Sequence, residues 1–529
     1  MVNSPQSRRG MVTAPHHLAS EAGLRILREG GNAIEATVAM AASLAVVYPH
    51  MNSLGGDGFW LISQEGAAPV AIDACGGAAA AATQALYAAQ GYSTIPTRGP
   101  LAANTVAGTV SGWGKALDLS ATLGGKLPLA RLVEDAVWSA EHGFPVSASQ
   151  HELTLAKLSE LKDAPGFADV FLVEGAAPAQ GAQMRLPALA RTLQRIGSAG
   201  TQDFYEGALA REMAHDLAAI GSPVTLSDLT AHQAQLRAAL TVRLRGARLY
   251  NFPPPTQGLA SLIILALFDR LAVKEGESFD HLHGIVEATK QAFLLRDAHV
   301  GDPASMRTVP EEFLSDVVLD GLAARIDRRL ALPWPQPASA GDTVWMGAMD
   351  EKGLSVSFIQ SIFFEFGSGC VLPGSGIVWQ NRGASFVLGG EGPRALGPAR
   401  KPFHTLNPAM AHFDDGRQMV YGTMGGEGQP QTQAALFSRY AMFGQPLQAA
   451  LDAPRWLLGR TWGEESVTLK LENRFDPQLV EALRAAGHKV ELLPAFTSTM
   501  GHAGAIVRRA DGSFEGASDP RSDGAAMGF

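Results

Sequence analysis

Thr343 is the residue whose type and surroundings point most directly to chemistry. It follows a proline-rich stretch, 333–337, and precedes the strand-like run 354–359. A cut before Thr343 would leave a free α-amine beside its own hydroxyl, and this amine, which titrates near neutral pH, can act as the base for that hydroxyl. Most threonines in such a place simply begin a strand. The catalytic interpretation therefore depends on the residues downstream.

Two downstream features could complete a site around Thr343. Ser361 ends the strand-like run 355–361, where a second hydroxyl could meet the threonine side chain, although a polar strand end explains it equally well. Gly425 and Gly426 lie in a turn between a predicted strand and a predicted helix. Backbone N–H groups in such a turn can stabilise an oxyanion, but a plain helix-entry turn is the alternative.

Histidines provide weaker signals. His404 lies in a polar loop, 401–408, shortly before the glycine pair, and a lone loop histidine is usually structural. His283 and Glu287 would share a helix face, whereas His281 would not. The chain contains no His-Glu-x-x-His or Cys-x-x-Cys pattern, so we expect no metal site.

Composition excludes several classes of function. The 529 residues are 46% hydrophobic and 18% charged, with a formal charge of −9, which argues against nucleic acid or an anionic membrane as a partner. The two cysteines, Cys75 and Cys370, are too few for a disulfide framework. The N-terminal residues lack an apolar signal core, and the apolar stretch 33–48 is too short to span a membrane, so we expect a cytoplasmic protein.

The residue pattern predicts layers of helices and sheets rather than a regular βαβ alternation. Leu18, Ala22 and Ile26 mark a first helix, and Asn32 with Glu35 forms a capping box for a second. The middle of the chain, 129–329, is mostly helical by this pattern, with helices at 259–271, 283–296 and 311–329. Strands are predicted at 59–63, 70–73, 355–361, 377–381, 409–413 and 418–422, helices near 431–443 and 477–486, and a final strand pair near 489–493 and 504–508.

The chain resembles the γ-glutamyltransferase family of N-terminal-nucleophile hydrolases over nearly its whole length. The matching segments are 30–33, 54–59, 106–112, 253–255, 301–303, 366–369, 425–426 and 517–521. The resemblance implies an α/β fold, a four-layer α/β/β/α sandwich, and a nucleophile at Thr343. It also implies self-cleavage before Thr343 into a mostly helical fragment 1–342, ending in a linker 332–342, and a strand-rich fragment 343–529. The fragments would stay associated, with no cofactor.

Departures from the family pattern concern recognition of the substrate. The family's arginine for the glutamyl carboxylate falls on the stretch 74–76, which contains Cys75, and its asparagine for the amino group falls on Phe363. The family's Asn-Asn-Gln-Met-Asp-Asp segment is replaced at 380–385, and its serine pair is replaced by His404 and Thr405. These changes dismantle recognition of a γ-glutamyl group, because a buried charged ligand without its partners is costly.

The resemblance is therefore to the subgroup that contains oxamate amidohydrolase of purine catabolism. We predict a threonine amidohydrolase with Thr343, Ser361, Gly425 and Gly426 as catalytic residues. The residues predicted to bind a small amide through its carboxylate are Asn381, Arg382, His404 and Thr405. Two alternatives remain: a γ-glutamyl hydrolase or transferase acting on glutathione-like compounds, and a processed but inactive binding homologue.

Overall fold

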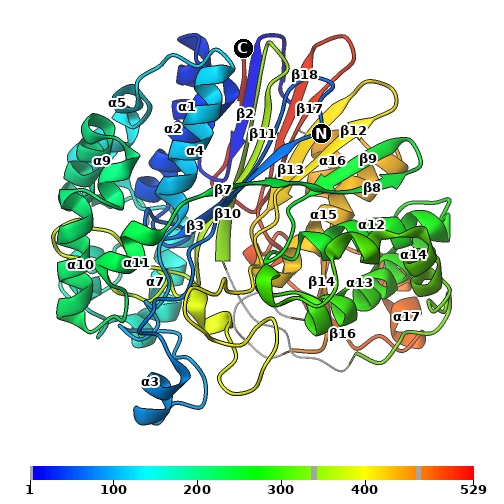
Figure 1. Cartoon of the computed structure of the whole chain (residues 1–529). Helices are drawn as coiled ribbons and strands as arrows, with labels where there is room; N and C mark the ends of the chain where they lie inside the picture. Colours follow the sequence, from blue (N-terminus) through cyan, green and yellow to red (C-terminus); the bar gives the residue numbers. More distant parts are fainter. Residues whose placement is uncertain (1–3, 335–341, 460–465) are drawn as a thin grey trace.

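Two antiparallel sheets of seven strands each form the centre of the protein (Figure 1). The computed structural model describes residues 4–334, 342–459 and 466–529. Sheet I has the order β19 (Ala525–Gly528), β2 (Gly10–Ala14), β10 (Asp342–Asp350), β11 (Ser355–Phe363), β3 (Asp57–Ser63), β4 (Val70–Ala74) and β7 (Gln235–Ala238). Sheet II has the order β1 (Gln6–Ser7), β18 (Phe514–Ser518), β17 (Ala503–Arg508), β13 (Gln418–Thr423), β12 (Ala409–Phe413), β9 (Ala247–Asn251) and β8 (Leu240–Leu244).

The two sheets face each other across an apolar layer. Phe59, Trp345 and Ile359 from sheet I pack against Met410 and Ile506 from sheet II. Strands β10 and β11 contact β13, and β10 also contacts β17. The sheets approach closely where Trp345 lies over glycines: a Cβ atom on Gly504 would come within 2.6 Å of its indole ring.

Helices cover the opposite face of each sheet. Helices α1 (His17–Arg28), α2 (Ala33–Val47) and α4 (Thr109–Thr122) share an apolar cluster with sheet I. Helices α12 (Gly258–Leu271) and α15 (Gln429–Phe437) pack on sheet II, and α13 (Phe279–His299) packs on α12. In Figure 1 these two groups of helices lie on either side of the strands. The predicted α/β class is confirmed.

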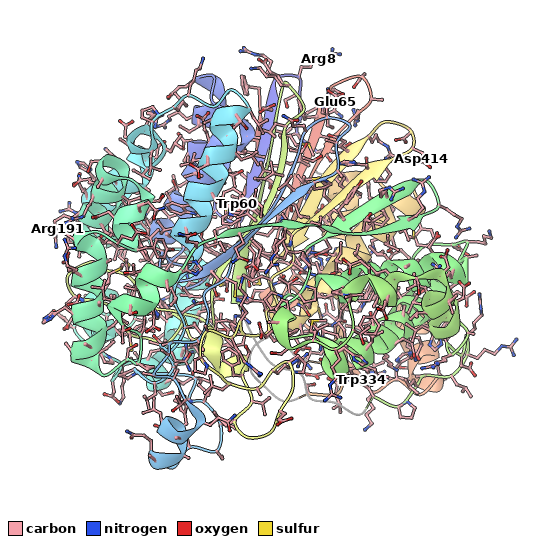
Figure 2. All side chains as sticks on the ribbon, viewed as in Figure 1. Arg8, Trp60, Glu65, Arg191, Trp334 and Asp414 are labelled. Carbon is pink, nitrogen blue, oxygen red and sulfur yellow. The ribbon has the colours of Figure 1, made fainter. Side chains whose placement is uncertain are left out.

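The interior is filled by side chains throughout (Figure 2). Trp60 of β3, labelled there, is fully buried and stacks on Phe358 of β11 at 3.8 Å between ring centroids. Among the described residues, no helix is long and apolar enough to cross a membrane. Asn32 and Glu35 form the predicted capping box, which is confirmed at the start of α2.

Shorter elements complete the described chain. The remaining helices are α3 (Gln84–Ala89), α5 (Leu129–Leu132), α6 (Glu134–His142), α7 (Ala148–Leu161), α8 (Phe167–Phe171), α9 (Pro187–Ala199), α10 (Ala208–Ile220), α11 (Leu226–Ala231), α14 (Asp316–Ala323), α16 (Leu447–Asp452) and α17 (Pro477–Ala485). A small sheet contains β14 (Trp456–Leu458), β15 (Leu469–Glu472) and β16 (Val490–Leu493), and a two-stranded ribbon contains β5 (Phe144–Pro145) and β6 (Gln183–Met184).

Three predicted elements are wrong. The segment 377–381 forms only isolated bridges, because its N–H groups bond to loops: Trp379 donates to the Cys370 carbonyl and Gln380 to that of Gly55. The predicted helix 311–329 is a 3₁₀ turn, Pro310–Leu314, followed by α14 alone. The third is the predicted final pairing: both strands are present as β16 and β17, but β16 pairs with β15 and β17 lies in sheet II.

The mostly helical middle of the chain also contributes strands to both sheets. β8 and β9 form a hairpin around Gly246, and β7 pairs with β4. The linker 332–342 can be compared with the structure only in part, because residues 335–341 lie outside the described ranges.

Candidate active site

Thr343 occupies an irregularity at the beginning of β10. Asp342 is paired with Phe363 of β11, whereas Val344 is paired with Gln360, so the register shifts at Thr343. The Thr343 side chain is fully buried. A bulge of this kind redirects a side chain at the end of a sheet, which is where active sites are often found.

Thr343, Ser361 and Asp57 occupy neighbouring positions on three adjacent strands. Trp345 and Ile359 are members of the apolar layer between the sheets. Because side chains alternate along a strand, Thr343 and Ser361 lie on this same inner face. Ser361 is paired with Asp57 of β3. Three polar side chains are therefore grouped at one end of the inter-sheet layer.

The Gly425–Gly426 turn lies beside Thr343. It follows β13, and both glycines have positive φ values, 114° and 51°, which other residues adopt only with strain. Gln429, the first residue of α15, donates from Nε2 to the Thr343 Oγ1 at 3.2 Å. The turn and the predicted nucleophile are thus held together by a residue that the sequence analysis did not identify.

Gln257 fixes the same turn from another side. Its Nε2 donates to the Gly426 carbonyl at 2.8 Å and to the Thr405 carbonyl at 2.7 Å. Its Oε1 accepts from Arg296 Nη1 at 2.9 Å, and Arg296 Nη2 donates to Glu427 at 2.6 Å. All five residues are buried, so the peptide planes around Gly426 are held by a network with little freedom to move.

Arg382 is a buried cation with few good hydrogen bonds. Its guanidinium lies over the Phe363 ring at 3.7 Å, and it donates to the Phe403 carbonyl and the Thr405 hydroxyl, both at 3.4 Å. Its Nε has no hydrogen-bond partner among the described residues, although Arg382 is fully buried. Burial lowers the pKa of Arg382 to about 9. An anionic ligand would supply the acceptors that this guanidinium lacks.

The backbone at Phe363 presents this aromatic surface to Arg382. Phe363 has φ of 81°, which is unfavourable for a residue with a side chain. Its N–H donates to Ser361 Oγ at 2.8 Å, so Ser361 stabilises the unusual conformation. Phe363, which stands where the family resemblance implies an asparagine, therefore makes a cation–π contact with the Arg382 guanidinium.

Asp57 is a buried carboxylate surrounded by donors. Its Oδ1 accepts from Gly76 N–H at 2.9 Å, Gly108 N–H at 3.1 Å and Gln380 Nε2 at 3.1 Å. Its Oδ2 lies 3.0 Å from His404 Nε2. Burial raises the pKa of Asp57 to about 7, against the effect of these hydrogen bonds.

His404 is held in one orientation by Asp57 and by the edge of the Phe59 ring, whose centroid is 4.8 Å away. Burial lowers the pKa of His404 well below its usual value, and the nearby Arg382 lowers it further. The imidazole is therefore neutral. Its Nδ1 is buried and has no hydrogen-bond partner in residues 4–334, 342–459 and 466–529.

Asn381 differs from the other predicted substrate-binding residues. Its Nδ2 donates to the Thr97 carbonyl at 2.7 Å, and its Oδ1 accepts from the Phe364 N–H at 3.1 Å. Both the nitrogen and the oxygen of the Asn381 amide are therefore hydrogen-bonded to backbone groups of loops. Thr405, in contrast, turns its hydroxyl toward Arg382. The structure thus groups Arg382, His404 and Thr405, while the Asn381 amide is engaged elsewhere.

Cys75, at the position of the family's arginine, is buried beside this group. The ligand atoms of Asp57, Cys75 and His404 lie within 4.8 Å of one another. Arg382 lies close enough to lower the pKa of both Asp57 and Cys75, although burial is the larger effect and raises both. A cavity of about 380 Å³ is lined by Cys75 together with Lys401 and other residues.

A second cluster of possible metal ligands is satisfied by the protein itself. His283 bonds to His488 at 2.9 Å and to the Asp327 carbonyl at 2.8 Å, and Lys290 donates to Glu287 at 2.7 Å. His283 and Glu287 share a helix face as predicted. A lysine ammonium already occupies the position where a metal ion would neutralise the glutamate.

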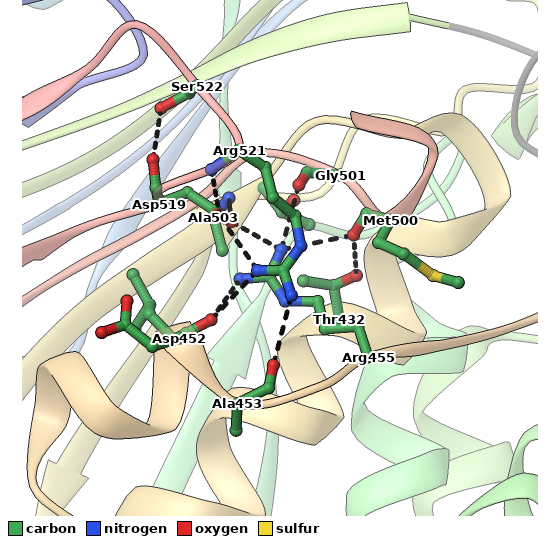
Figure 3. A network of polar contacts seen from close by, with 12 residues as sticks. Thr432, Asp452, Ala453, Arg455, Met500, Gly501, Ala503, Asp519, Arg521 and Ser522 are labelled. Atoms are coloured by element: carbon green, nitrogen blue, oxygen red, sulfur yellow. Dashed lines mark hydrogen bonds and ion pairs between the residues drawn. The ribbon is translucent and has the colours of Figure 1, made fainter. Parts of the chain in front are cut away.

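Figure 3 shows a buried network of charges around Arg455, Asp519 and Arg521. Arg455 and Arg521 both pair with Asp519, at 2.5 Å and 3.1 Å, and Arg521 also pairs with Glu472 at 2.6 Å. All four side chains are almost completely buried. Breaking such a network by removing one partner is costly, because the remaining charge stays buried.

This network holds the chain segment that borders the turn. Asp519 accepts from the Ala503 N–H at 2.6 Å, and Arg455 donates to the Gly501 carbonyl at 3.0 Å. The neighbouring His502 accepts, through its carbonyl, from the N–H of Met424 at 3.3 Å. The residue before the Gly425–Gly426 turn is thereby tied to a rigid base.

Comparison with known proteins identifies the family. The family model for gamma-glutamyltranspeptidase matches residues 19–529. The chain is 56% identical over its whole length to a protein from Klebsiella pneumoniae subsp. pneumoniae, all of which is covered, named "Oxamate amidohydrolase proenzyme". It is 41% identical to the "Glutathione hydrolase-like YwrD proenzyme" of Bacillus subtilis, with 98% of each chain covered. This chain belongs to the gamma-glutamyltranspeptidase family.

A solved structure supports the same placement. The cephalosporin acylase from Bacillus halodurans superposes with a TM-score of 0.91 at 31% identity, covering 100% of this chain and 97% of that one. The resemblance inferred from the sequence is thus confirmed for the family.

Proposed function

We propose that the protein is a self-processing threonine amidohydrolase that converts oxamate to oxalate and ammonia. The observation that carries the proposal is Arg382, a buried cation whose hydrogen bonds are incomplete. Arg382 lies against Phe363, and Phe363 is the strand partner of the residue immediately before Thr343. Oxamate is an amide whose carboxylate is directly attached to the scissile carbonyl. A cation this near the nucleophile suits such a substrate. The similarity to the Klebsiella protein supports the same assignment.

The residues suggest a two-step reaction. The Thr343 Oγ attacks the amide carbon while its own α-amine takes the hydroxyl proton. The N–H groups of the Gly425–Gly426 turn stabilise the oxyanion. The C–N bond then breaks, the proton passes to the leaving nitrogen, and ammonia departs from an oxalyl ester of Thr343. Water attacks this ester and gives a proton to the α-amine, and oxalate leaves as that proton passes to the Thr343 Oγ.

The changed pocket supports a small substrate over a γ-glutamyl group. A γ-glutamyl group binds through charges several bonds from its scissile carbonyl. Cys75 supplies no cation for its carboxylate, and Phe363 supplies no amide for its amino group. Both are buried, and the cation beside them, Arg382, would repel the amino group of a γ-glutamyl ligand.

We also propose the four-layer α/β/β/α arrangement and the division into fragments 1–342 and 343–529. The two facing sheets with helices on their other faces support the layering. Strands from both sides of the cleavage site are interleaved in both sheets: β10 lies between β2 and β11, and β12 lies between β13 and β9. Cleavage before Thr343 would therefore leave the fragments hydrogen-bonded together.

Ammonia release from a panel of amides tests the assignment. Oxamate should be hydrolysed with a much larger kcat/KM than glutamine, glutathione or γ-glutamyl-p-nitroanilide. A clear preference for the γ-glutamyl compounds would instead support the activity named for the Escherichia coli relative, glutathione hydrolase, which is 30% identical. Turnover of none of these by a fully cleaved protein would favour the inactive binding homologue.

A further inference from the structure

Two buried polar atoms of neighbouring side chains lack a hydrogen-bond partner within the part of the chain that the structure describes. Arg382 Nε is a donor without an acceptor, and His404 Nδ1 lacks a partner as well. Both side chains are fully buried, where an unsatisfied polar atom is costly. Arg382 lies across the backbone on both sides of His404, because it donates to Phe403 and Thr405. The two atoms therefore belong to one small region.

Asp57 determines whether His404 Nδ1 is a donor or an acceptor. An ionised carboxylate can only accept hydrogen bonds, so His404 Nε2 must carry the proton that it shares with Asp57 Oδ2 at 3.0 Å. A neutral imidazole carries one proton. Its Nδ1 is then a bare acceptor on the part of the ring that does not contact Asp57.

We infer that His404 Nδ1, fixed as an acceptor by the ionised form of Asp57, receives an N–H of the substrate amide and makes the enzyme selective for amides over esters. This inference rests on the proposed function. It adds the group that accepts a hydrogen bond from the nitrogen that leaves as ammonia. The carboxylate of oxamate pairs with the Arg382 guanidinium, and its amide N–H donates to His404 Nδ1. Asp57 acts through His404 and is a positioning residue.

The position of Asp57 supports this role. It lies on β3 and is paired with Ser361 of β11, the strand that adjoins β10, and it bonds to His404 from there. Phe59 packs against the ring and prevents it from turning. The acceptor is thus held by a rigid sheet rather than by a loop alone.

Asp57→Asn provides a sharp test. Three N–H donors surround Oδ1, so the asparagine oxygen should remain there and its NH₂ group should replace Oδ2. That NH₂ group donates to His404 Nε2, which must then lose its proton. The proton moves to Nδ1 and converts the acceptor into a donor. A change of one atom thereby inverts the proposed contact without altering volume.

The experiment compares oxamate with monomethyl oxalate, an ester that has no N–H. At a pH above 8, where Asp57 is mostly ionised, the ratio of kcat/KM for amide over ester should fall about 10- to 100-fold in Asp57→Asn. His404→Gln, whose longer side chain places its amide near the Nε2 position, should lower the same ratio. Equal losses for both substrates in both variants would overturn the inference.

Asp73→Asn is the matched control. Asp73 is a buried carboxylate on the neighbouring strand β4, but it bonds to Lys401 and to the Cys75 N–H instead of His404. Its substitution should lower stability and leave the amide-to-ester ratio unchanged. A fall in the ratio as large as that in Asp57→Asn would contradict a specific role for the Asp57–His404 pair.

A second readout does not depend on activity. In protein labelled with ¹⁵N-histidine, the His404 resonances should show a bare Nδ1 in the wild type and a protonated Nδ1 in Asp57→Asn. A wild-type protein that fails on oxamate but shows this tautomer would contradict the proposed substrate and keep the role of Asp57. A protonated Nδ1 in the wild type above pH 8 would refute the inference itself.

Discussion

At the scale of single residues, the site contains charges that are buried without full compensation. Arg382 has two long hydrogen bonds and an unpartnered Nε, and Asp57 has a raised pKa although several donors surround it. A folded protein gains no stability from such arrangements. Incompletely compensated charges are expected where a ligand supplies the missing partner. Substitution of Arg382 or Asp57 therefore tests the proposed site.

Arg382→Ala should reduce kcat/KM for oxamate by roughly 30- to 150-fold, which corresponds to about 2–3 kcal/mol for one charge-assisted contact. Arg382→Lys should restore little activity, because a lysine cannot make a two-point contact with a carboxylate. Self-cleavage should continue in both variants, since it requires no external acid. If oxamate turnover is unchanged in Arg382→Ala, the substrate carboxylate is bound by His404 and Thr405 instead.

Ionisation of Asp57 should make stability depend on pH. Its pKa is raised to about 7 in the folded protein, so the group contributes stability that is present below its unfolded value of 3.8 and is lost as the pH rises through about 7. The charged or titratable groups near it are Arg382, His404, Cys75 and Tyr205.

The measurement compares unfolding midpoints with and without Asp57→Asn, both in a Thr343→Ala background that stays one chain. Between pH 4 and 7 the protein with Asp57 should lose stability relative to the asparagine variant, and above about pH 8 the difference should be constant. A difference that does not change over this range would show that Asp57 ionises normally.

At the scale of elements, the turn between β13 and α15 depends on backbone conformations that favour glycine. Gly425→Ala should abolish both self-cleavage and hydrolysis, because a residue with a Cβ resists φ of 114° and would displace the N–H groups. Gly512→Ala is the control: its φ is 80° and nothing lies within 4 Å of an added Cβ. That variant should lose about 1–2 kcal/mol of stability and keep its activity. Equal activity of the two variants would exclude the turn from catalysis.

Elements whose signals are local were predictable from the sequence. The capping box at Asn32 joins residues three positions apart, and the strands 409–413 and 418–422 are short, mostly apolar runs between glycine-bearing turns. The segment 377–381 was mistaken for a strand because it is apolar, although its N–H groups bond to loops.

The supporting residues of the site could not be predicted, because their partners are distant in the chain. Gln429 lies 86 positions from Thr343, and Asp57 lies 347 positions from His404. Glutamine and aspartate have no periodicity or motif that would link them across such distances. The family resemblance located Thr343, Gly425 and Gly426 but gave no signal for Gln257, whose amide joins Gly426 to Thr405.

At the scale of the whole molecule, cleavage should divide the chain without separating it. A cut before Thr343 splits 55.6 kDa into 342 and 187 residues, which gives fragments of roughly 36 and 20 kDa in proportion to length. Both bands should appear on a denaturing gel and elute together on gel filtration. Thr343→Ala should give one band. An uncut wild-type chain that hydrolyses oxamate would refute the mechanism.

The interleaving of strands in both sheets has a consequence for the lifetime of the mature protein. An uncut chain that unfolds can refold by itself, because all its strands remain on one polypeptide. After cleavage, refolding of either sheet becomes an encounter between two molecules, and its rate falls with dilution. Each fragment alone would expose unpaired strand edges, which favour aggregation. The mature protein would then persist through a slow rate of unfolding rather than through a reversible equilibrium, and maturation would be a step that cannot be repeated.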